Sequence, residues 1–296
     1  MKSSPFVTII DLTITKKLQE DLKNQGFSIS HPPNTVFSAI KPGVSCTLYS
    51  SGKLLVQGKA KHDFITYYLE PHILQNLTYS HPEQYVNVNP HIGIDEAGKG
   101  DFFGPLCIAG VYAESKGVSR LLQLGVCDSK RLSDQTILTL VPILKKEFPH
   151  SIVKLPPETY NRLYEKCKNL NTLLAWAHAT AIEDLYKKTN CSDVIIDQFA
   201  HSSVVERAVK NKSLSISLTQ RYKGEEDPVV AAASLIARHA FLEGIHKLST
   251  MYQFPFPKGA SKEVIKKGKE FILMHGPELL QKVAKMHFKT AKEVLF

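Results

Sequence analysis

The sequence predicts an α/β protein in which a mixed β-sheet is flanked by helices and preceded by a small α+β domain. Three observations support this fold class. From about residue 91 onward, short apolar strand patterns alternate with longer helical patterns, which is typical of a sheet with helices on its faces. The first 75 residues instead combine one amphipathic helix with several short strand patterns. A polar segment with two prolines separates the two parts.

The first segment begins with a helical pattern. Ile14, Leu18 and Leu22 recur at i, i+4 and i+8, and Gly26 follows as a helix stop. The letters CTLYSSGKLLVQG then join two β runs through Ser-Ser-Gly, which predicts a hairpin. The expected elements are a helix through residues 14–22, strands over 27–30 and 36–40, the hairpin over 46–58 and a helix over 61–75.

The charge of this segment favours a binding role. It has no arginine, and its eight lysines and five acidic residues give a net charge of +3. It contains no cluster of residues that could carry out chemistry. We therefore expect residues 1–75 to form a binding domain. The polar stretch 76–90, which contains Pro82 and Pro90, is expected to link it to a second domain over 91–296.

The second domain carries the alternating pattern. Its apolar runs are short enough for strands, and the segments between them have helical periodicity. Strands are expected over 92–95, 106–113, 152–155, 193–197 and 214–220, and helices over 133–148, 157–168, 171–188 and 201–210, with the remainder largely helical.

Composition limits the cellular setting. No apolar run approaches the ~20 residues that a membrane-spanning helix needs, and the N-terminus has no signal-peptide pattern. The five cysteines are widely spaced and form no CxxC, which argues against a disulfide framework and against a zinc site. We expect a cytoplasmic protein without a membrane partner. The formal net charge of +9 favours a polyanionic partner, because Lys and Arg that neutralise phosphates release condensed counterions.

Acidic residues stand where strands of the second domain are expected to end. Asp95 ends the strand over 92–95, Asp197 ends the strand over 193–197, and Glu225 lies in the turn GEED before a helix. Carboxylates at strand ends of an α/β sheet can converge at one edge. Grouped carboxylates repel one another unless they hold cations, and Mg²⁺ takes oxygen ligands. Two such metals can clamp a displacement at phosphorus.

The carboxylate pair Asp95 and Glu96 runs directly into glycines in the stretch HIGIDEAGKGDFFGPL. Adjacent side chains on a regular strand face opposite ways, so both reach one metal pair only if the strand ends or bends there. The loop Gly98, Lys99 and Gly100 lets the backbone approach a ligand closely. Its N–H groups can meet phosphate or sugar oxygens, including the ribose 2′-hydroxyl that distinguishes RNA from DNA.

Each of these signals also has a purely structural explanation. Asp-Glu before glycine is common in turns, and acidic residues favour the first turn of a helix. The small residues over 229–238 are typical of tight helix packing. The residues open to such explanations are Asp197 as a helix cap, Glu225, Glu226 and Asp227 as a helix start, Trp176 and His178 as core or helix-surface residues, and Ser129 and Lys130 as a helix entry.

In combination and in this order, the motifs resemble those of the type 2 ribonucleases H, and most closely of ribonuclease HIII, over nearly the whole chain. The matching stretches are GIDEAGKGDFFGPL, DSK, DVIIDQF and YKGEEDPVVAAASLIAR, and CTLYSSGKLLVQG is similar to part of the small TATA-binding-protein-like domain of ribonuclease HIII. The resemblance implies a ribonuclease H-like catalytic domain over 91–296 and a TATA-binding-protein-like, substrate-binding domain over 1–75.

The resemblance also implies roles for individual residues. Asp95, Glu96 and Asp197 match three catalytic, metal-binding acidic residues. Glu225 is the best match for the fourth, although the spacing to AAAS is one residue shorter than expected and leaves Glu226 open. The residues that match substrate-contacting positions are Gly98, Lys99 and Gly100, at the loop that inspects the 2′-hydroxyl, and Ser129 and Lys130, near the substrate backbone.

The implied activity is endonucleolytic hydrolysis of the RNA strand of RNA/DNA hybrids with Mg²⁺ or Mn²⁺ at a two-metal site, leaving 5′-phosphate and 3′-hydroxyl ends. We expect a monomer without an obligate protein partner. The alternative within the family is ribonuclease HII-like incision at single ribonucleotides in DNA, which the Gly-Lys-Gly loop and the N-terminal domain disfavour. A non-catalytic nucleic-acid binder is disfavoured by the filled carboxylate positions, and a nucleotide-phosphate enzyme by the absence of GxGxxG and GxxxxGK[ST].

Overall fold

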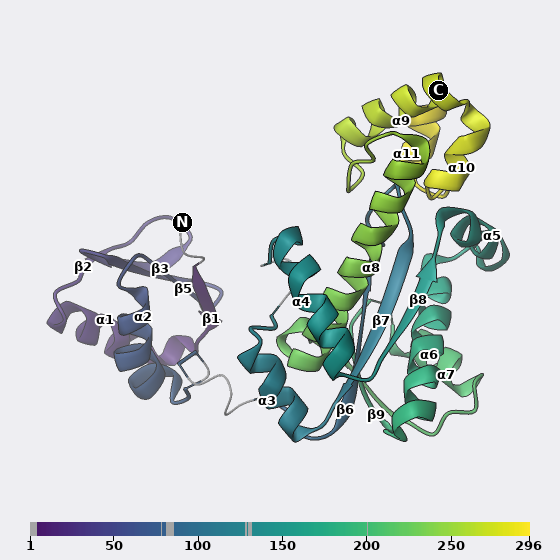
Figure 1. The fold of residues 1–296 in the computed structure, drawn as a ribbon. Helices are drawn as coiled ribbons and strands as arrows, with labels where there is room; N and C mark the ends of the chain where they lie inside the picture. Colours follow the sequence, from purple (N-terminus) through teal and green to yellow (C-terminus); the bar gives the residue numbers. More distant parts are fainter. Residues whose placement is uncertain (1–4, 78, 81–85, 128, 130–131, 200) are drawn as a thin grey trace. The chain divides into compact units, whose positions relative to one another are not determined.

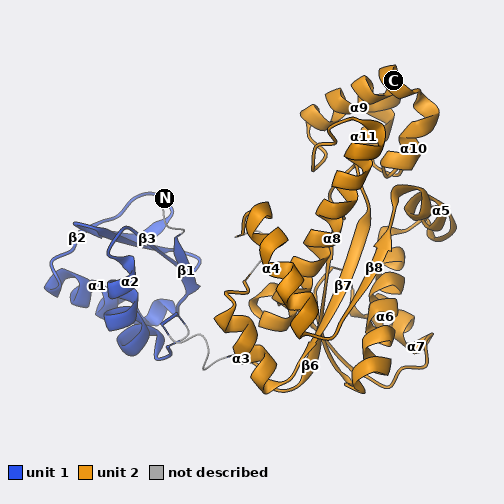
Figure 2. Cartoon of the chain, viewed as in Figure 1, with its two compact units in different colours: residues 1–86 blue, residues 87–296 orange. Residues whose placement is uncertain are grey.

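The computed structural model describes residues 5–77, 79–80, 86–127, 129, 132–199 and 201–296 (Figure 1). The chain divides into two compact units, Met1–Val86 and Asn87–Phe296 (Figure 2). The expected α/β class with a small additional N-terminal domain is confirmed. Tyr79, in the stretch expected to be a linker, packs its ring 5.3 Å from that of Phe6 in the first unit.

The first unit is an antiparallel sheet with helices on one face. The strand order is β1-β5-β4-β3-β2. Buried residues alternate along β4, so that Cys46 and Leu48 face the core while the side chains between them face outward. The elements are β1 (Phe6–Ile9), α1 (Thr15–Asn24), β2 (Ser28–Ser30), β3 (Thr35–Lys41), β4 (Val44–Tyr49), β5 (Lys53–Gln57), α2 (Lys61–Phe64) and a π-helix (Ile65–Leu74).

The expected helix and hairpin of this unit are confirmed, and two features differ from the sequence prediction. Strand β1 was not expected; only four residues long, it is held by its pairing with β5, where Ile9 lies opposite Lys53. The single helix expected over 61–75 is a short α-helix continued by a π-helix that contains Pro71. Proline removes a helical hydrogen bond, which favours such irregular winding.

The second unit is built on a mixed five-stranded sheet. Its strand order is β10-β9-β6-β7-β8. Strands β6, β9 and β10 are parallel, whereas β7 pairs antiparallel with both β6 and β8. The strands are β6 (His91–Ala97), β7 (Leu106–Ala113), β8 (His150–Leu155), β9 (Asp193–Asp197) and β10 (Ser217–Arg221).

Helices cover both faces of this sheet, with α8 and α4 on one side and α6 and α7 on the other (Figure 1). Alternation along β6 explains the division, because Ile92 and Ile94 pack in the core with α6, whereas Gly93 approaches the backbone of α8. The helices are α3 (Ser115–Gln123), α4 (Asp134–Glu147), α5 (Pro157–Cys167), α6 (Leu170–Thr189), α7 (Ser202–Lys210), α8 (Pro228–Tyr252), α9 (Lys262–His275), α10 (Leu280–Val283) and α11 (Lys289–Leu295).

The prediction that a strand ends at Asp95 is wrong. Strand β6 continues to Ala97, and β7 pairs with it throughout, with Asp95 opposite Ala109 and Glu96 opposite Ile108. The antiparallel partner supplies hydrogen bonds that keep the strand regular past the carboxylates. Asp95 and Glu96 therefore point to opposite faces of the sheet.

The other elements of the second unit largely follow the prediction. Helix α3 was not expected, and β10 is shifted from the predicted 214–220 to Ser217–Arg221. Of the described helices, only α8 is long and apolar enough to cross a membrane, but 78% of that stretch is buried inside the protein. It is the core helix of this domain.

Candidate active site

Parallel pairing of β6 and β9 brings two candidate carboxylates to the same edge of the sheet. Ile94 lies opposite Ile196 in the register, so Asp95 and Asp197 are the next residues on adjacent strands. Asp197 is the last residue of β9 and is half-buried. The two carboxylates therefore lie next to each other as predicted, although only Asp197 ends its strand and Asp95 lies within β6.

Asp95 lies on the α8 side of the sheet and is nearly inaccessible to solvent. Its Oδ1 accepts a hydrogen bond from the N–H of Glu96 at 2.7 Å. Burial, together with the nearby charges of Glu96 and Asp197, raises the pKa of Asp95 to about 7, although a hydrogen bond with Ser234 favours the ionised form. An uncompensated buried carboxylate of this kind is stabilised by any cation that approaches it.

Glu96 lies on the α6 side, where two basic side chains contact its carboxylate. Nε2 of His178 is 3.1 Å from Oε2, and Nζ of Lys99 is 3.3 Å from Oε1. Burial raises the pKa of Glu96, but the hydrogen bond to His178 and the contact with Lys99 outweigh burial and lower it below its ordinary value. Glu96 is therefore held ionised, in contrast to Asp95.

Phe199 joins these two partners of Glu96. Its ring lies 4.5 Å from the ring of His178, and the ammonium of Lys99 lies 5.5 Å from its centroid. Phe199 follows β9 by two residues, so the end of that strand, helix α6 and the glycine loop meet around one carboxylate. Such packing restricts the rotamers of the side chains that it contacts.

The turn before α8 brings Glu225 to the end of β9. The N–H of Gly224 donates to Oδ1 of Asp197 at 2.7 Å, and a Cβ on Gly224 would lie 2.7 Å from Cα of Asp197. Only glycine permits this approach. Glu225 is half-buried beside this contact, whereas the side chain of Glu226 is 74% exposed and pairs with Lys223.

Asp227, the third acidic residue of this turn, has a structural role. Its carboxylate caps α8 by accepting hydrogen bonds from the N–H groups of Val229 and Val230. The same oxygen lies 3.0 Å from Nε2 of His91 at the start of β6. Asp227 thus belongs to the helix start as expected, but as a buried cap and not as part of a solvated first turn, and it ties α8 to the central strand.

The backbone conformation of the glycine loop requires glycine at position 98. Gly98 has φ +86°, and a Cβ there would lie 2.2 Å from the carbonyl oxygen of Pro105. Gly100 is exposed and has open space around its Cα. Within the described part of the chain, the backbone N–H groups of Lys99 and Gly100 have no hydrogen-bond partner. They are available to an acceptor on a ligand.

Ser129 lies near the carboxylates, because its hydroxyl is 2.9 Å from that of Ser234, the same serine that contacts Asp95. Lys130, the other residue expected near the substrate backbone, lies outside the described residues. Ser234 itself was interpreted from the sequence as part of a tightly packed helix. It packs there, and its hydroxyl also contacts the carboxylate site.

The donor set fits a divalent cation. Carboxylates are the ligands that Mg²⁺ and Mn²⁺ take, and such an ion would offset the burial and the repulsion that raise the pKa of Asp95. Among the described residues, no three His, Cys, Asp or Glu side chains are close enough to enclose a metal by themselves. Mg²⁺ does not need an all-protein cage, since it keeps several waters and accepts substrate oxygens.

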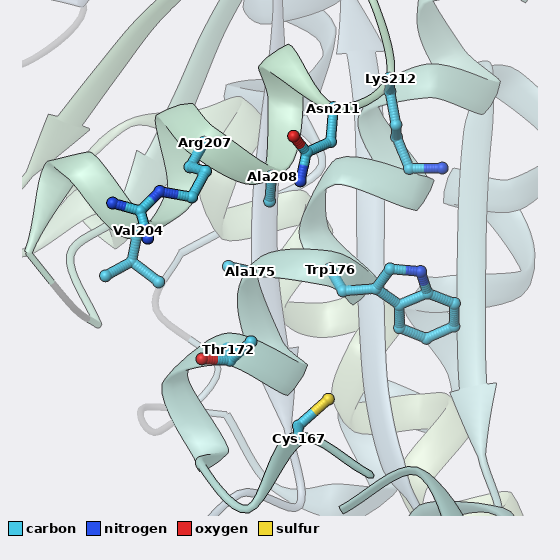
Figure 3. A pocket seen from close by; sticks show the side chains of 9 residues that line it. All are labelled: Cys167, Thr172, Ala175, Trp176, Val204, Arg207, Ala208, Asn211 and Lys212. Carbon is cyan, nitrogen blue, oxygen red and sulfur yellow. The ribbon is translucent and has the colours of Figure 1, made fainter.

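A cavity of about 520 Å³ lies between α6 and α7, and none of the candidate carboxylates lines it (Figure 3). Trp176, which the sequence placed in the core or on a helix surface, is half-exposed at this cavity. Arg207 and Lys212 also line it. This cavity is therefore separate from the candidate carboxylate site.

The sequence did not predict which side chains contact the carboxylate of Glu96. His178 is fully buried, as the core interpretation implied, but it faces a carboxylate. A histidine inside an otherwise apolar helical stretch was the available signal. Its partner could not be identified, because 82 residues separate it from Glu96 in the chain.

Comparisons with known proteins cover nearly the whole chain and point to one family. A family model described as Ribonuclease HII matches residues 92–291, and one described as a domain of unknown function (DUF3378) matches residues 5–80. A ribonuclease HIII of Protochlamydia amoebophila (strain UWE25) is 53% identical over 98% of this chain and 97% of its own. A ribonuclease HIII of Chlamydia muridarum is 46% identical over 99% of this chain and 97% of its own.

The fold comparison points the same way. A crystal structure of Bst-RNase HIII in complex with Mn²⁺ is similar to this chain with a TM-score of 0.69 and 28% identity, covering 99% of this chain and 98% of that one. The similarity thus includes both units. The chain belongs to the ribonuclease HIII group of the type 2 ribonuclease H family.

Proposed function

We propose that this chain is a metal-dependent endonuclease that hydrolyses the RNA strand of RNA/DNA hybrids to 5′-phosphate and 3′-hydroxyl ends. The observation that carries this function is the placement of Asp95 and Asp197 side by side on parallel strands, next to a loop whose backbone donors at Lys99 and Gly100 have no partner among the described residues. Neighbouring carboxylates at the edge of a sheet suit divalent metals and phosphate chemistry. Free peptide N–H groups suit a ribose hydroxyl.

Mg²⁺ or Mn²⁺ would be held by Asp95 and Asp197 on neighbouring strands, with Glu225 close to the end of β9. Glu96 points to the opposite face of β6 and would join these ligands only through a local bend of the strand. Asp95 and Asp197 would be the principal ligands of the ions, and Glu96 and Glu225 would complete the ligand set and help to orient the attacking water. The half-buried Glu225 is favoured over Glu226, because the latter points to solvent. When bound, a metal pair polarises the scissile phosphate and lowers the pKa of a bound water.

Recognition of the RNA strand is assigned to the glycine loop. The N–H groups of Lys99 and Gly100, which no group in the described part of the chain accepts, can meet a 2′-hydroxyl, and Gly98 allows the turn that carries them. Ser129 and Lys130 are assigned to the substrate backbone. The hydroxyl of Ser129 contacts that of Ser234, which also contacts Asp95, and this proximity to the carboxylates supports the assignment.

The first unit is assigned to hybrid binding. The face of its sheet opposite the helices carries Lys53, and the exposed side chains of Val7 and Ile9 lie on the adjacent edge strand. An exposed apolar surface combined with lysines suits the shape and charge of a duplex groove. We place the protein in the cytoplasm as a monomer, and its five free cysteines fit a reducing compartment.

Three duplexes test this function: an RNA/DNA hybrid, a DNA duplex with one embedded ribonucleotide, and an all-DNA duplex. Cleavage of only the RNA strand of the hybrid is expected. Strong incision at the single ribonucleotide would instead assign ribonuclease HII-like activity to the chain. Binding of the hybrid without cleavage in either Mg²⁺ or Mn²⁺ would make it a nucleic-acid-binding protein on a nuclease fold.

A further inference from the structure

The glycine loop consists of two halves with different constraints. The N–H groups of Lys99 and Gly100 have no partner among the described residues, so this half can accept a ligand. The half from Asp101 to Gly104 is instead bound to the C-terminal segment. Its ties are Phe102 N to Gly259 O at 2.9 Å, Gly259 N to Asp101 Oδ1 at 2.6 Å, Gly104 N to Val283 O at 2.9 Å and Lys285 N to Phe102 O at 2.9 Å.

The aromatic residues of the loop strengthen this attachment. Phe102 and Phe103 are fully buried in the core that the C-terminal helices form, with Phe271 and Leu280 among their neighbours. These helices, α9 to α11, gather beside the far end of α8 (Figure 1). The loop therefore forms part of a second hydrophobic core, built largely by the last 40 or so residues of the chain.

Lys285 lies at the centre of this junction. Its side chain is fully buried, and its ammonium donates to the carbonyl oxygens of Asp101 at 2.7 Å and Gly104 at 2.8 Å. The ring centroid of Tyr160 lies 5.8 Å from Nζ. No carboxylate forms an ion pair with Lys285 in the described structure. Burying a lysine that forms no ion pair is costly, and the two carbonyl contacts are the hydrogen bonds that offset this cost.

The two carbonyls that Lys285 binds enclose the loop segment between Asp101 and Gly104. Fixing both ends of this segment fixes the direction in which the chain leaves Gly100. The N–H groups of Lys99 and Gly100 are then held in one orientation before any substrate arrives. Preorganised donors of this kind bind and discriminate better than donors on a mobile loop, because their ordering does not oppose binding.

We propose that Lys285 is a positioning residue for ribonucleotide recognition, holding the glycine loop so that its free N–H groups meet the RNA strand. This inference rests on the proposed function, which assigns those N–H groups to the 2′-hydroxyl. Lys285 itself is buried and does not touch the substrate. It acts through the backbone of the loop.

The test compares the wild type with Lys285→Met, which keeps the length and apolar stem of the side chain but removes its donors. Val294→Ala is the matched control, because Val294 is buried in the same C-terminal core and packs against Gly268, away from the loop. Binding constants for the RNA/DNA hybrid and for an all-DNA duplex are measured in Ca²⁺, and KM and kcat for the hybrid in Mg²⁺. The midpoint of thermal unfolding is measured for each variant.

Lys285→Met is expected to reduce the preference for the hybrid over DNA by about tenfold, the factor of one hydrogen bond, and to raise KM more than it lowers kcat. Val294→Ala should lower the unfolding midpoint but keep the preference. An unchanged preference in Lys285→Met overturns the inference while leaving the proposed function intact. A wild type without any preference for the hybrid overturns both.

If Lys285→Met does not fold, hydrogen exchange of the wild type tests whether the loop is held in place. The amides of Phe102, Gly104 and Lys285 are expected to exchange slowly and together, whereas those of Lys99 and Gly100 exchange fast. Exchange of Phe102 and Gly104 as fast as that of Gly100 would show that the loop is not clamped, and would overturn the inference.

Discussion

His178 and Glu96 form a buried contact between helix α6 and the central strand, with Nε2 of the imidazole 3.1 Å from Oε2 of the carboxylate. Because a carboxylate only accepts, Nε2 carries the hydrogen. Nδ1 of the same ring is buried and has no hydrogen-bond partner within the residues that the structure describes. An imidazole with one satisfied and one unsatisfied nitrogen in an apolar helix is costly, so its contact with Glu96 is the reason to expect a functional role.

Replacing His178 by Ala should release the carboxylate of Glu96 from one of its two partners. We expect metal affinity or kcat to fall by about 10–100-fold, as is typical when a side chain that orients a ligand is lost. His178→Gln should recover part of the loss, since its amide N–H can donate to Oε2. Calorimetric titration with Mn²⁺ measures the affinity. Leu174→Ala, a buried change on the same helix, is the control, and an equal effect in that variant would contradict the assignment.

Substitution by alanine should lower stability at Gly98 and leave it almost unchanged at Gly100. A methyl group at Gly98 would lie 2.2 Å from the oxygen of Pro105, and its φ of +86° is unfavourable for alanine, so Gly98→Ala should destabilise the protein by roughly 1–3 kcal/mol. Gly100→Ala meets no atom within 4 Å and should leave stability within about 0.5 kcal/mol. Urea unfolding measures both. Equal stabilities of the two variants would show that the loop adopts another conformation.

Lys285 should make stability depend on pH. Burial lowers the pKa of Lys285 to about 7, although the nearby Asp101 and Cys107 act in the opposite direction. Between about pH 7 and the unfolded value near 10.5, the unfolded chain binds the extra proton, so stability rises with pH. The free energy of unfolding of the wild type, relative to Lys285→Met, should increase by up to about 1.4 kcal/mol per pH unit in this window. A constant difference from pH 7 to 10 would contradict the lowered pKa.

Deleting the first unit, residues 1–86, should weaken binding more than chemistry. The second unit has its own sheet and core, and the four candidate carboxylates all lie in it. We expect KM for the hybrid to rise by at least about tenfold with kcat nearly unchanged, because the lost contacts stabilise substrate and transition state equally. Steady-state kinetics that reach saturating hybrid distinguish a rise in KM from a fall in kcat. A large fall in kcat would assign a catalytic contribution to the first unit.

The sequence predicted those parts of the molecule that local pattern determines. The order of strands and helices, and the acidic residues that end β9 and precede α8, follow from periodicity and turn residues near each element. The continuation of β6 past Asp95 depends on pairing with β7, which no pattern within β6 reveals. The contacts of Glu96 with His178, and of Lys285 with the loop, join residues 82 and more than 180 positions apart. Such contacts are decided by tertiary packing.

The most direct measurement of the central claim is cleavage of an end-labelled RNA/DNA hybrid in Mg²⁺ by the wild type and by Asp95→Asn, with an all-DNA duplex as control. The substitution keeps the size of the buried side chain and removes the charge that would hold the metal. The wild type should cut only the RNA strand, and Asp95→Asn should bind the hybrid without cutting it. Cleavage by Asp95→Asn at the wild-type rate, or no cleavage by the wild type in either Mg²⁺ or Mn²⁺, would contradict the account.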